Sequence, residues 1–111
     1  MNAIAEALAN AIGADRVAID AEALAARRYD QWAVKHLRDW RGEAVPAPGC
    51  VVRPRSVEEV QKIVRIAAER RVPLIPYGLG SGVCGGIEPT PDAILLDMGA
   101  MNRVRYIDSD D

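Results

Sequence analysis

Apolar residues recur at four-residue steps at the start of the chain. Ile4, Leu8 and Ile12 follow this spacing, and alanines fill most of the positions around them in residues 3–11. One apolar stripe at helical spacing predicts a short amphipathic helix that packs against other elements. Gly13 is expected to end this helix, because glycine often follows the last helical residue.

Two further helices are expected before residue 42. After a brief extended piece at 16–19, Asp20 can cap a second short helix that reaches about residue 26. A third helical face carries aromatic and apolar residues at three- and four-residue steps: Tyr29, Trp32, His36, Leu37 and Trp40. We expect the rest of a larger protein to bury this face. The charged residues between are expected to face solvent: Lys35, Arg38 and Asp39.

A longer helix is predicted after a linker at 42–49 and a short strand at 51–53. Ser56 and Glu59 form a capping box, in which the serine hydroxyl accepts from the Glu59 N–H and the glutamate reaches back to the serine N–H. The helix is expected to continue to about Arg71. Its apolar residues form one stripe: Val57, Val60, Ile63, Val64 and Ala67.

Two more apolar segments predict strands. Residues 72–75 form the first, and the proline within them favours an edge position or the start of a strand, because proline has no N–H to donate. Residues 93–97 form a nearly continuous apolar run, which is typical of a strand covered on both faces. Asp97 is expected to cap the turn at 98–102, and a place in the lining of the cofactor site is the alternative. A further strand is predicted at 104–107, and the whole order indicates an α/β unit.

Residues 76–86, which follow the strand at 72–75, hold five of the nine glycines. Unhindered backbone N–H groups can converge on an anion, so a ligand phosphate is a natural occupant of such a loop. Residues 80–85 match G-x-G-x-x-G, yet Pro89 and Pro91 prevent the helix that a dinucleotide fingerprint requires. No Lys-Ser/Thr pair follows, which excludes a Walker loop. A turn that only lets two segments pack closely is the alternative.

The order of these segments resembles a known flavoprotein family. The matching pieces are residues 52–60, the glycine-rich loop, residues 95–98 and residues 101–104. Their order and spacing are more specific than any one motif. On these pieces the chain resembles the FAD-binding domain of the vanillyl-alcohol oxidase and p-cresol methylhydroxylase (PCMH) superfamily. It is most similar to the branch with glycolate oxidase subunits, D-lactate dehydrogenases and alkyl-dihydroxyacetone-phosphate synthase.

The resemblance implies an α/β (α+β) fold with two parts. Residues 1–45 form a helical N-terminal segment, and residues 46–111 form the first part of a PCMH-type FAD-binding domain, a β-α-β unit with a glycine-rich pyrophosphate loop. Family members are several times longer, so we expect an amino-terminal fragment whose partner is the remainder of its own polypeptide. Because its apolar faces are then uncovered, we expect the isolated chain to self-associate and to bind FAD weakly or not at all.

The implied function is that of an FAD-dependent oxidoreductase acting on a small-molecule substrate. A 2-hydroxy acid of the D-lactate or glycolate type is expected, with the flavin as hydride acceptor. An alkyl-dihydroxyacetone-phosphate synthase-like flavoenzyme is the alternative within the family. A non-catalytic α/β module that binds a partner or a phosphorylated ligand is the alternative from another class.

In that family the loop wraps the FAD pyrophosphate through backbone amides. The residues that match it here are the expected cofactor contacts: Pro76, Tyr77, Gly78, Leu79, Gly80, Ser81 and Gly82. Some relatives attach FAD covalently through a histidine after the first glycines. Ser81 stands at that position, so the resemblance implies non-covalent FAD. The catalytic residues of the family lie in later segments, and none is assigned here.

Composition and residue spacing limit the partners, the location and the side-chain chemistry that the sequence allows. A formal net charge of −2 offers no basic surface of the kind that nucleic acid requires. We see neither a signal peptide nor a membrane-spanning run, so a cytoplasmic protein is expected. Cys50 and Cys84 lack metal-ligand spacing and are expected to be reduced thiols, with Cys84 as a small apolar filler. His36, the single histidine, is expected to pack like an aromatic residue rather than to catalyse.

Overall fold

The computed structural model describes residues 3–111. Within these residues four strands form one sheet in the order β1-β2-β4-β3. The strands are β1 (Val17–Ala18), β2 (Cys50–Val52), β3 (Leu74–Tyr77) and β4 (Ile94–Asp97). β4 pairs in parallel with both β2 and β3, whereas β1 pairs antiparallel with β2. The predicted α/β (α+β) class is therefore confirmed.

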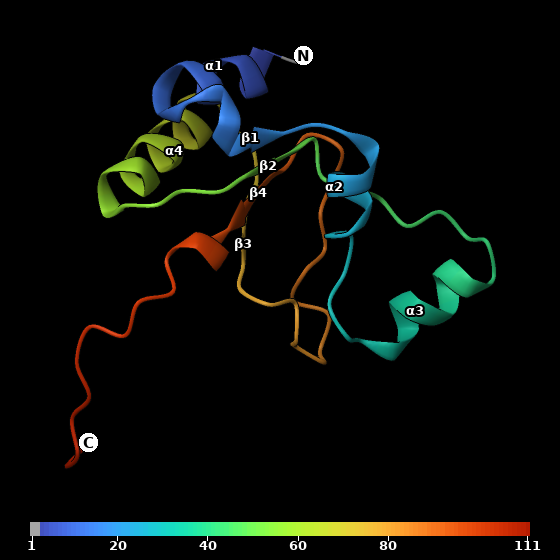
Figure 1. Cartoon of the computed structure of the whole chain (residues 1–111). Coiled ribbons are helices and arrows are strands. Elements are labelled where there is room, and N and C mark those ends of the chain that lie inside the picture. The colour runs from blue at the N-terminus through green and yellow to red at the C-terminus, as the bar shows by residue number, and fades with distance from the viewer. Residues whose placement is uncertain (1–2) are drawn as a thin grey trace.

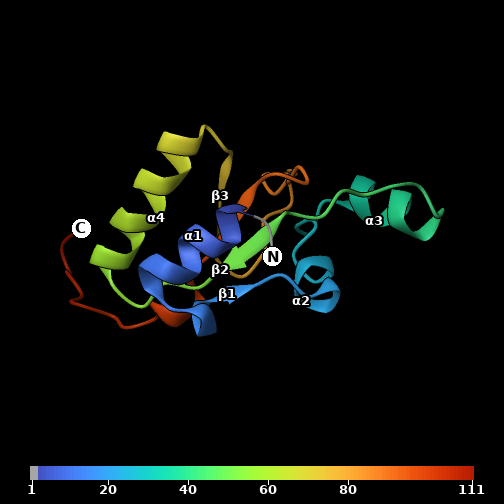
Figure 2. The same cartoon turned by 90° about the horizontal axis from the view of Figure 1, so that it is seen from above.

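Two of the four helices within residues 3–111 lie next to the sheet, and the other two lie between β1 and β2 in the chain. They are α1 (Ala3–Ile12), α2 (Ala21–Ala25), α3 (Ala33–Trp40) and α4 (Val57–Arg70), with short 3₁₀ turns at Ala14–Arg16 and Met98–Ala100. Figures 1 and 2 show α1 and α4 side by side next to the sheet, while α3 stands apart beyond α2. Among residues 3–111, no helix has the length and apolar character needed to cross a bilayer.

The core lies between the sheet and the pair formed by α1 and α4. Buried residues of the helices meet alternate residues of β2 and β4: Ala5, Leu8, Ile63 and Ala67 against Cys50, Val52, Ile94 and Leu96. Because successive strand side chains point to opposite faces, each strand contributes every second residue to this layer. Full burial of a Leu or Ile side chain stabilises the fold by about 1.5–3 kcal/mol. All four residues of β4 are buried, as predicted for a strand covered on both faces.

The start of α4 follows the prediction in part. Ser56 is the N-cap, and its Oγ accepts from the Glu59 N–H at 3.2 Å. The reciprocal bond is different from the predicted one, because Glu59 Oε2 accepts from the Arg55 N–H at 2.7 Å. Glu59 also pairs with Arg16 at 3.0 Å, which ties α4 to the turn after α1. The apolar stripe is narrower than predicted, since Val57 and Val64 are exposed.

Three other predictions need correction. α3 begins at Ala33, so Tyr29 and Trp32 precede it and do not share its face. β3 begins two residues later than predicted and includes Pro76, which is tolerated because β3 is an edge strand. Residues 104–107 form no strand: the segment is exposed and pairs with none of the four strands of the sheet.

Candidate functional site

The glycine-rich loop begins at the carboxyl end of β3, as predicted. Six of its residues line a cavity of about 290 Å³ together with Asp30 and Ile87: Gly78, Leu79, Gly80, Ser81, Gly82 and Gly86. Five of the seven predicted cofactor contacts, residues 78–82, therefore lie together around one cavity. Pro76 and Tyr77 belong to β3, the strand that leads into the loop.

The backbone of this loop fits an anionic group. Within residues 3–111, the N–H groups of residues 79–81 donate to no other part of the protein. Gly80 adopts φ +66°, and a Cβ at this position would collide with the Tyr77 hydroxyl. Glycine alone adopts this positive φ without strain and has no Cβ to collide with the hydroxyl. The loop thus presents free, unhindered donors, which is the arrangement that a phosphate accepts.

A buried carboxylate from a distant segment holds the far end of the loop. Asp30 is 2% exposed, and its Oδ2 accepts from the N–H groups of Gly85 and Gly86, each at 3.1 Å. Its Oδ1 accepts from the Trp32 N–H at 2.9 Å. The sequence pattern did not reveal this residue, because its partners lie 55 and 56 positions away.

Two more contacts join the same segments. The Gln31 N–H donates to the Gly82 carbonyl at 2.8 Å, and Lys35 Nζ lies 2.8 Å from Glu88 Oε1. The Lys35 side chain is 6% exposed, so its predicted place on a solvated face is wrong. Its stem is buried while its ammonium reaches the exposed Glu88. The hydrogen bond and the charge of Lys35 hold the pKa of Glu88 below its usual value.

The two cysteines differ in environment. Both are free thiols, but Cys84 is exposed, so its predicted role as an apolar filler is wrong. Cys50 lies in β2 and is buried, and this burial raises its thiol pKa to about 11. Among residues 3–111, no three His, Cys, Asp or Glu side chains gather where they could hold a metal ion.

Asp97 caps the turn after β4, as predicted. Its Oδ1 accepts from the Gly99 N–H at 2.9 Å. An additional partner was not predicted, because Arg27 Nη2 lies 2.8 Å from Asp97 Oδ2. Asp97 therefore caps the carboxyl end of β4 and does not line the cavity of the glycine-rich loop.

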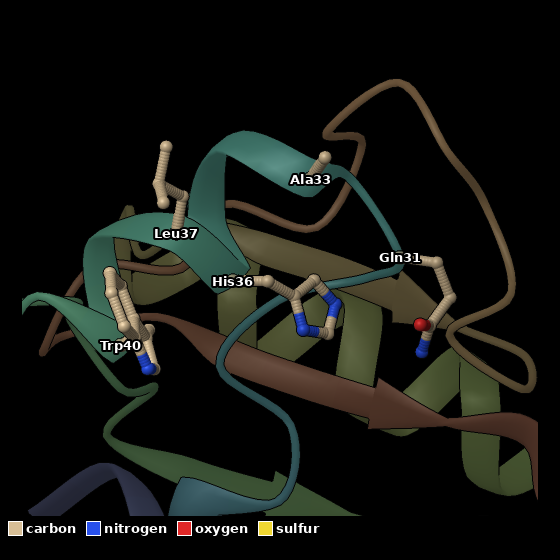
Figure 3. A pocket seen from close by; sticks show the side chains of 5 residues that line it. All are labelled: Gln31, Ala33, His36, Leu37 and Trp40. Carbon is tan, nitrogen blue, oxygen red and sulfur yellow. The ribbon is translucent and has the colours of Figure 1, made fainter.

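A second cavity of about 580 Å³ lies along α3. Figure 3 shows the residues that line it: Gln31, Ala33, His36, Leu37 and Trp40. The His36 ring packs edge-on against Tyr29, with 4.7 Å between ring centroids, which agrees with the predicted packing role. His36 Nε2 also lies 3.0 Å from the Asp30 carbonyl oxygen. Trp40 is 84% exposed, so residues 3–111 do not cover this face.

Sequence comparison links the chain to proteins of known chemistry. Residues 48–111 match the family described as "FAD binding domain". Glycolate oxidase subunit GlcD of Bacillus subtilis (strain 168) is 38% identical over 63 residues, which cover 57% of this chain. The matched part is 13% of the length of that relative. The chain thus spans about an eighth of the length of this curated relative.

Structural comparison gives the same fold. A solved alkyldihydroxyacetonephosphate synthase superposes with a TM-score of 0.85 at 28% identity, over 99% of this chain and 22% of that one. A structure of p-cresol methylhydroxylase with substrate bound superposes with a TM-score of 0.66 at 23% identity, over 95% of this chain and 19% of that one. The second likeness shows the fold alone, and the predicted PCMH-type fold is confirmed.

Proposed function

The chain belongs to the FAD binding domain family, and from this membership we propose that its glycine-rich loop binds the pyrophosphate of FAD. FAD is the cofactor of this family. The observation that carries the proposal is the cavity at residues 78–82, beside N–H groups that have no other partner within residues 3–111. The proposed contacts are Pro76, Tyr77, Gly78, Leu79, Gly80, Ser81 and Gly82.

Each part of the loop has a distinct task in this proposal. The N–H groups of residues 79–81 donate to phosphate oxygens, and the Ser81 hydroxyl adds one hydrogen bond, worth about 1.5–3 kcal/mol when the acceptor is charged. Asp30 also lines the cavity, but three backbone N–H groups already bind its carboxylate oxygens and offset their charge. When bound, FAD supplies a flavin that accepts a hydride.

We propose that the whole protein oxidises a small 2-hydroxy acid of the D-lactate or glycolate type. The likeness to glycolate oxidase subunit GlcD supports this choice. The second candidate is an alkyl-dihydroxyacetone-phosphate synthase-like flavoenzyme, which the TM-score of 0.85 to that enzyme supports. A non-catalytic phospholigand-binding or partner-binding module is the candidate from another class.

The organisation of the whole protein is also a proposal. We divide the chain into a helical segment, residues 1–45, and the first part of the FAD domain, residues 46–111. The remainder of the polypeptide would cover the apolar face of α3, where Leu37 and Trp40 are exposed. Self-association through such faces and a cytoplasmic location stay predictions.

Absorbance spectroscopy separates these candidates. Protein expressed from the complete reading frame is purified, and its visible absorbance spectrum is recorded to detect oxidised flavin. We expect flavin bands that bleach on anaerobic addition of D-lactate or glycolate. Flavin bands that neither acid bleaches would favour the synthase-like enzyme, and a colourless protein that takes up no added FAD would contradict the cofactor assignment.

A further inference from the structure

The Asp30 carboxylate is buried without a cation. Its ion-pair partners would be Lys, Arg or His, and none lies within salt-bridge distance among residues 3–111. Burial of an ionised carboxylate is unfavourable unless hydrogen bonds replace the lost water. Here three backbone N–H groups do so, those of Trp32, Gly85 and Gly86. The carboxylate and the loop therefore stabilise each other.

Two of these donors belong to the glycine-rich loop. The consecutive N–H groups of Gly85 and Gly86 converge on one oxygen, Asp30 Oδ2, as they would on a bound anion. An internal anion thus occupies the later part of the loop. The earlier part, residues 79–81, keeps its N–H groups free of partners within residues 3–111.

Neighbours of Asp30 reinforce the contact. The Gln31 N–H donates to the Gly82 carbonyl at 2.8 Å. The Trp32 ring lies against Gly85, whose φ is +78°, so closely that a Cβ there would come within 2.7 Å of a ring carbon. Three consecutive residues, 30–32, therefore hold the loop at 82, 85 and 86. The other end of the loop is fixed by the pairing of β3 with β4.

We infer that Asp30 is a positioning residue, which fixes the glycine-rich loop in the conformation that binds the FAD pyrophosphate. This inference rests on the proposed function of residues 76–82. A loop that is held at both ends loses less conformational freedom when a ligand binds. It therefore binds that ligand with higher affinity than a mobile loop would. The role requires a carboxylate, because only an ionised carboxylate accepts hydrogen bonds at both oxygens. Asparagine would turn an NH₂ group toward a backbone N–H on one side.

The test compares two substitutions that remove the same charge. Asp30→Asn removes the charge and turns an NH₂ group toward one of the N–H groups that Asp30 binds, and Asp39→Asn is the charge-matched control, because Asp39 bonds Arg28 and Tyr29 instead of the loop. Amide hydrogen exchange is measured without FAD in protein from the complete reading frame. We expect exchange of the Gly85 and Gly86 N–H groups to rise at least tenfold in Asp30→Asn, with α4 unchanged, and to stay at the parent level in Asp39→Asn.

The same proteins are then titrated with FAD. We expect the dissociation constant of Asp30→Asn to rise at least tenfold, while saturating FAD restores the visible flavin spectrum of the parent. A purely structural lesion would leave that spectrum altered and would raise exchange in α4 as well. Unchanged exchange of the Gly85 and Gly86 N–H groups, or faster exchange with parent-like FAD affinity, would overturn the inference.

Two further outcomes are distinguishable. If the parent protein binds no FAD, the proposed function of the loop fails first, and the positioning role fails with it. If Asp30→Asn does not fold, Gly85→Ala decides, because its methyl group meets the Trp32 ring and moves one N–H away from Asp30. Gly85→Ala is expected to weaken FAD binding at least tenfold, and parent-like affinity would overturn the inference.

Discussion

Arg27 and Asp97 form an ion pair across 70 residues of sequence, with 2.8 Å between Arg27 Nη2 and Asp97 Oδ2. The pair joins the segment after α2 to the end of β4, and the Asp97 side chain is 7% exposed. Removal of the arginine leaves a buried carboxylate uncompensated. We expect Arg27→Gln to lower the free energy of unfolding by about 3 kcal/mol, measured by urea denaturation with circular dichroism.

The neighbouring Arg28 offers a matched control. Arg28 pairs with Asp39 at 2.8 Å, and a third of the Asp39 side chain is exposed. The Arg28 hydrogen bond and that of Tyr29 lower the pKa of Asp39. Ion pairs with more exposed carboxylates contribute less to stability, so Arg28→Gln is expected to have a smaller effect than Arg27→Gln. Equal losses in the two variants would contradict the importance assigned to burial at Asp97.

Ser56→Ala tests the N-cap of α4. The Ser56 hydroxyl accepts from the Glu59 N–H, which has no partner within the helix. We expect the loss of this bond to destabilise the protein by about 0.5–2 kcal/mol in thermal or urea denaturation. Ser109→Ala, in the exposed C-terminal segment, is the control. An unchanged midpoint for Ser56→Ala would show that the cap contributes nothing.

Much of the fold could be predicted, because local signals decide it. The capping residue and the apolar spacing define α4, and the run of apolar residues defines β4. The loop position follows from the strand before it. The strand predicted at 104–107 failed because strand formation depends on a partner, and sequence pattern alone does not supply one.

The site was less predictable, for a physical reason. The glycines of the loop are visible in the sequence, but the residues that hold the loop are not. Asp30 lies at no helical or strand period that relates it to Gly85, and Lys35 looks like an ordinary charged residue. Such partners are brought together by the three-dimensional course of the chain, and no local sequence pattern predicts that course.

The two thiols are expected to react at very different rates. The thiolate is the reactive form, and each pH unit below the pKa lowers its fraction about tenfold. With a pKa of about 11, Cys50 holds little thiolate at neutral pH, and burial also shields it. At pH 8 we expect a thiol reagent to label Cys84 quickly and Cys50 only after unfolding, with Cys50 labelling rising as the pH approaches 11. Mass spectrometry after partial labelling identifies the site, and equal rates would contradict the burial of Cys50.

FAD is predicted to be held without a covalent bond. Ser81, at the position where some relatives carry the linking histidine, cannot form a comparable attachment. We expect urea or acid to release all flavin, which then passes an ultrafiltration membrane that retains the protein. Flavin fluorescence that stays with the protein band on a denaturing gel would refute this prediction.

The most direct test of the proposed pyrophosphate loop is the FAD content of Gly82→Val in protein expressed from the complete reading frame. A valine at this position would place a branched side chain beside the cavity, where even a Cβ lies 3.2 Å from Asp30 Oδ2. Val83→Ala is the control, because Val83 is exposed in the same loop and does not line the cavity. We predict stoichiometric FAD in the parent and in Val83→Ala, and no FAD in Gly82→Val, whose α4 remains folded. Normal FAD content in Gly82→Val would contradict the account.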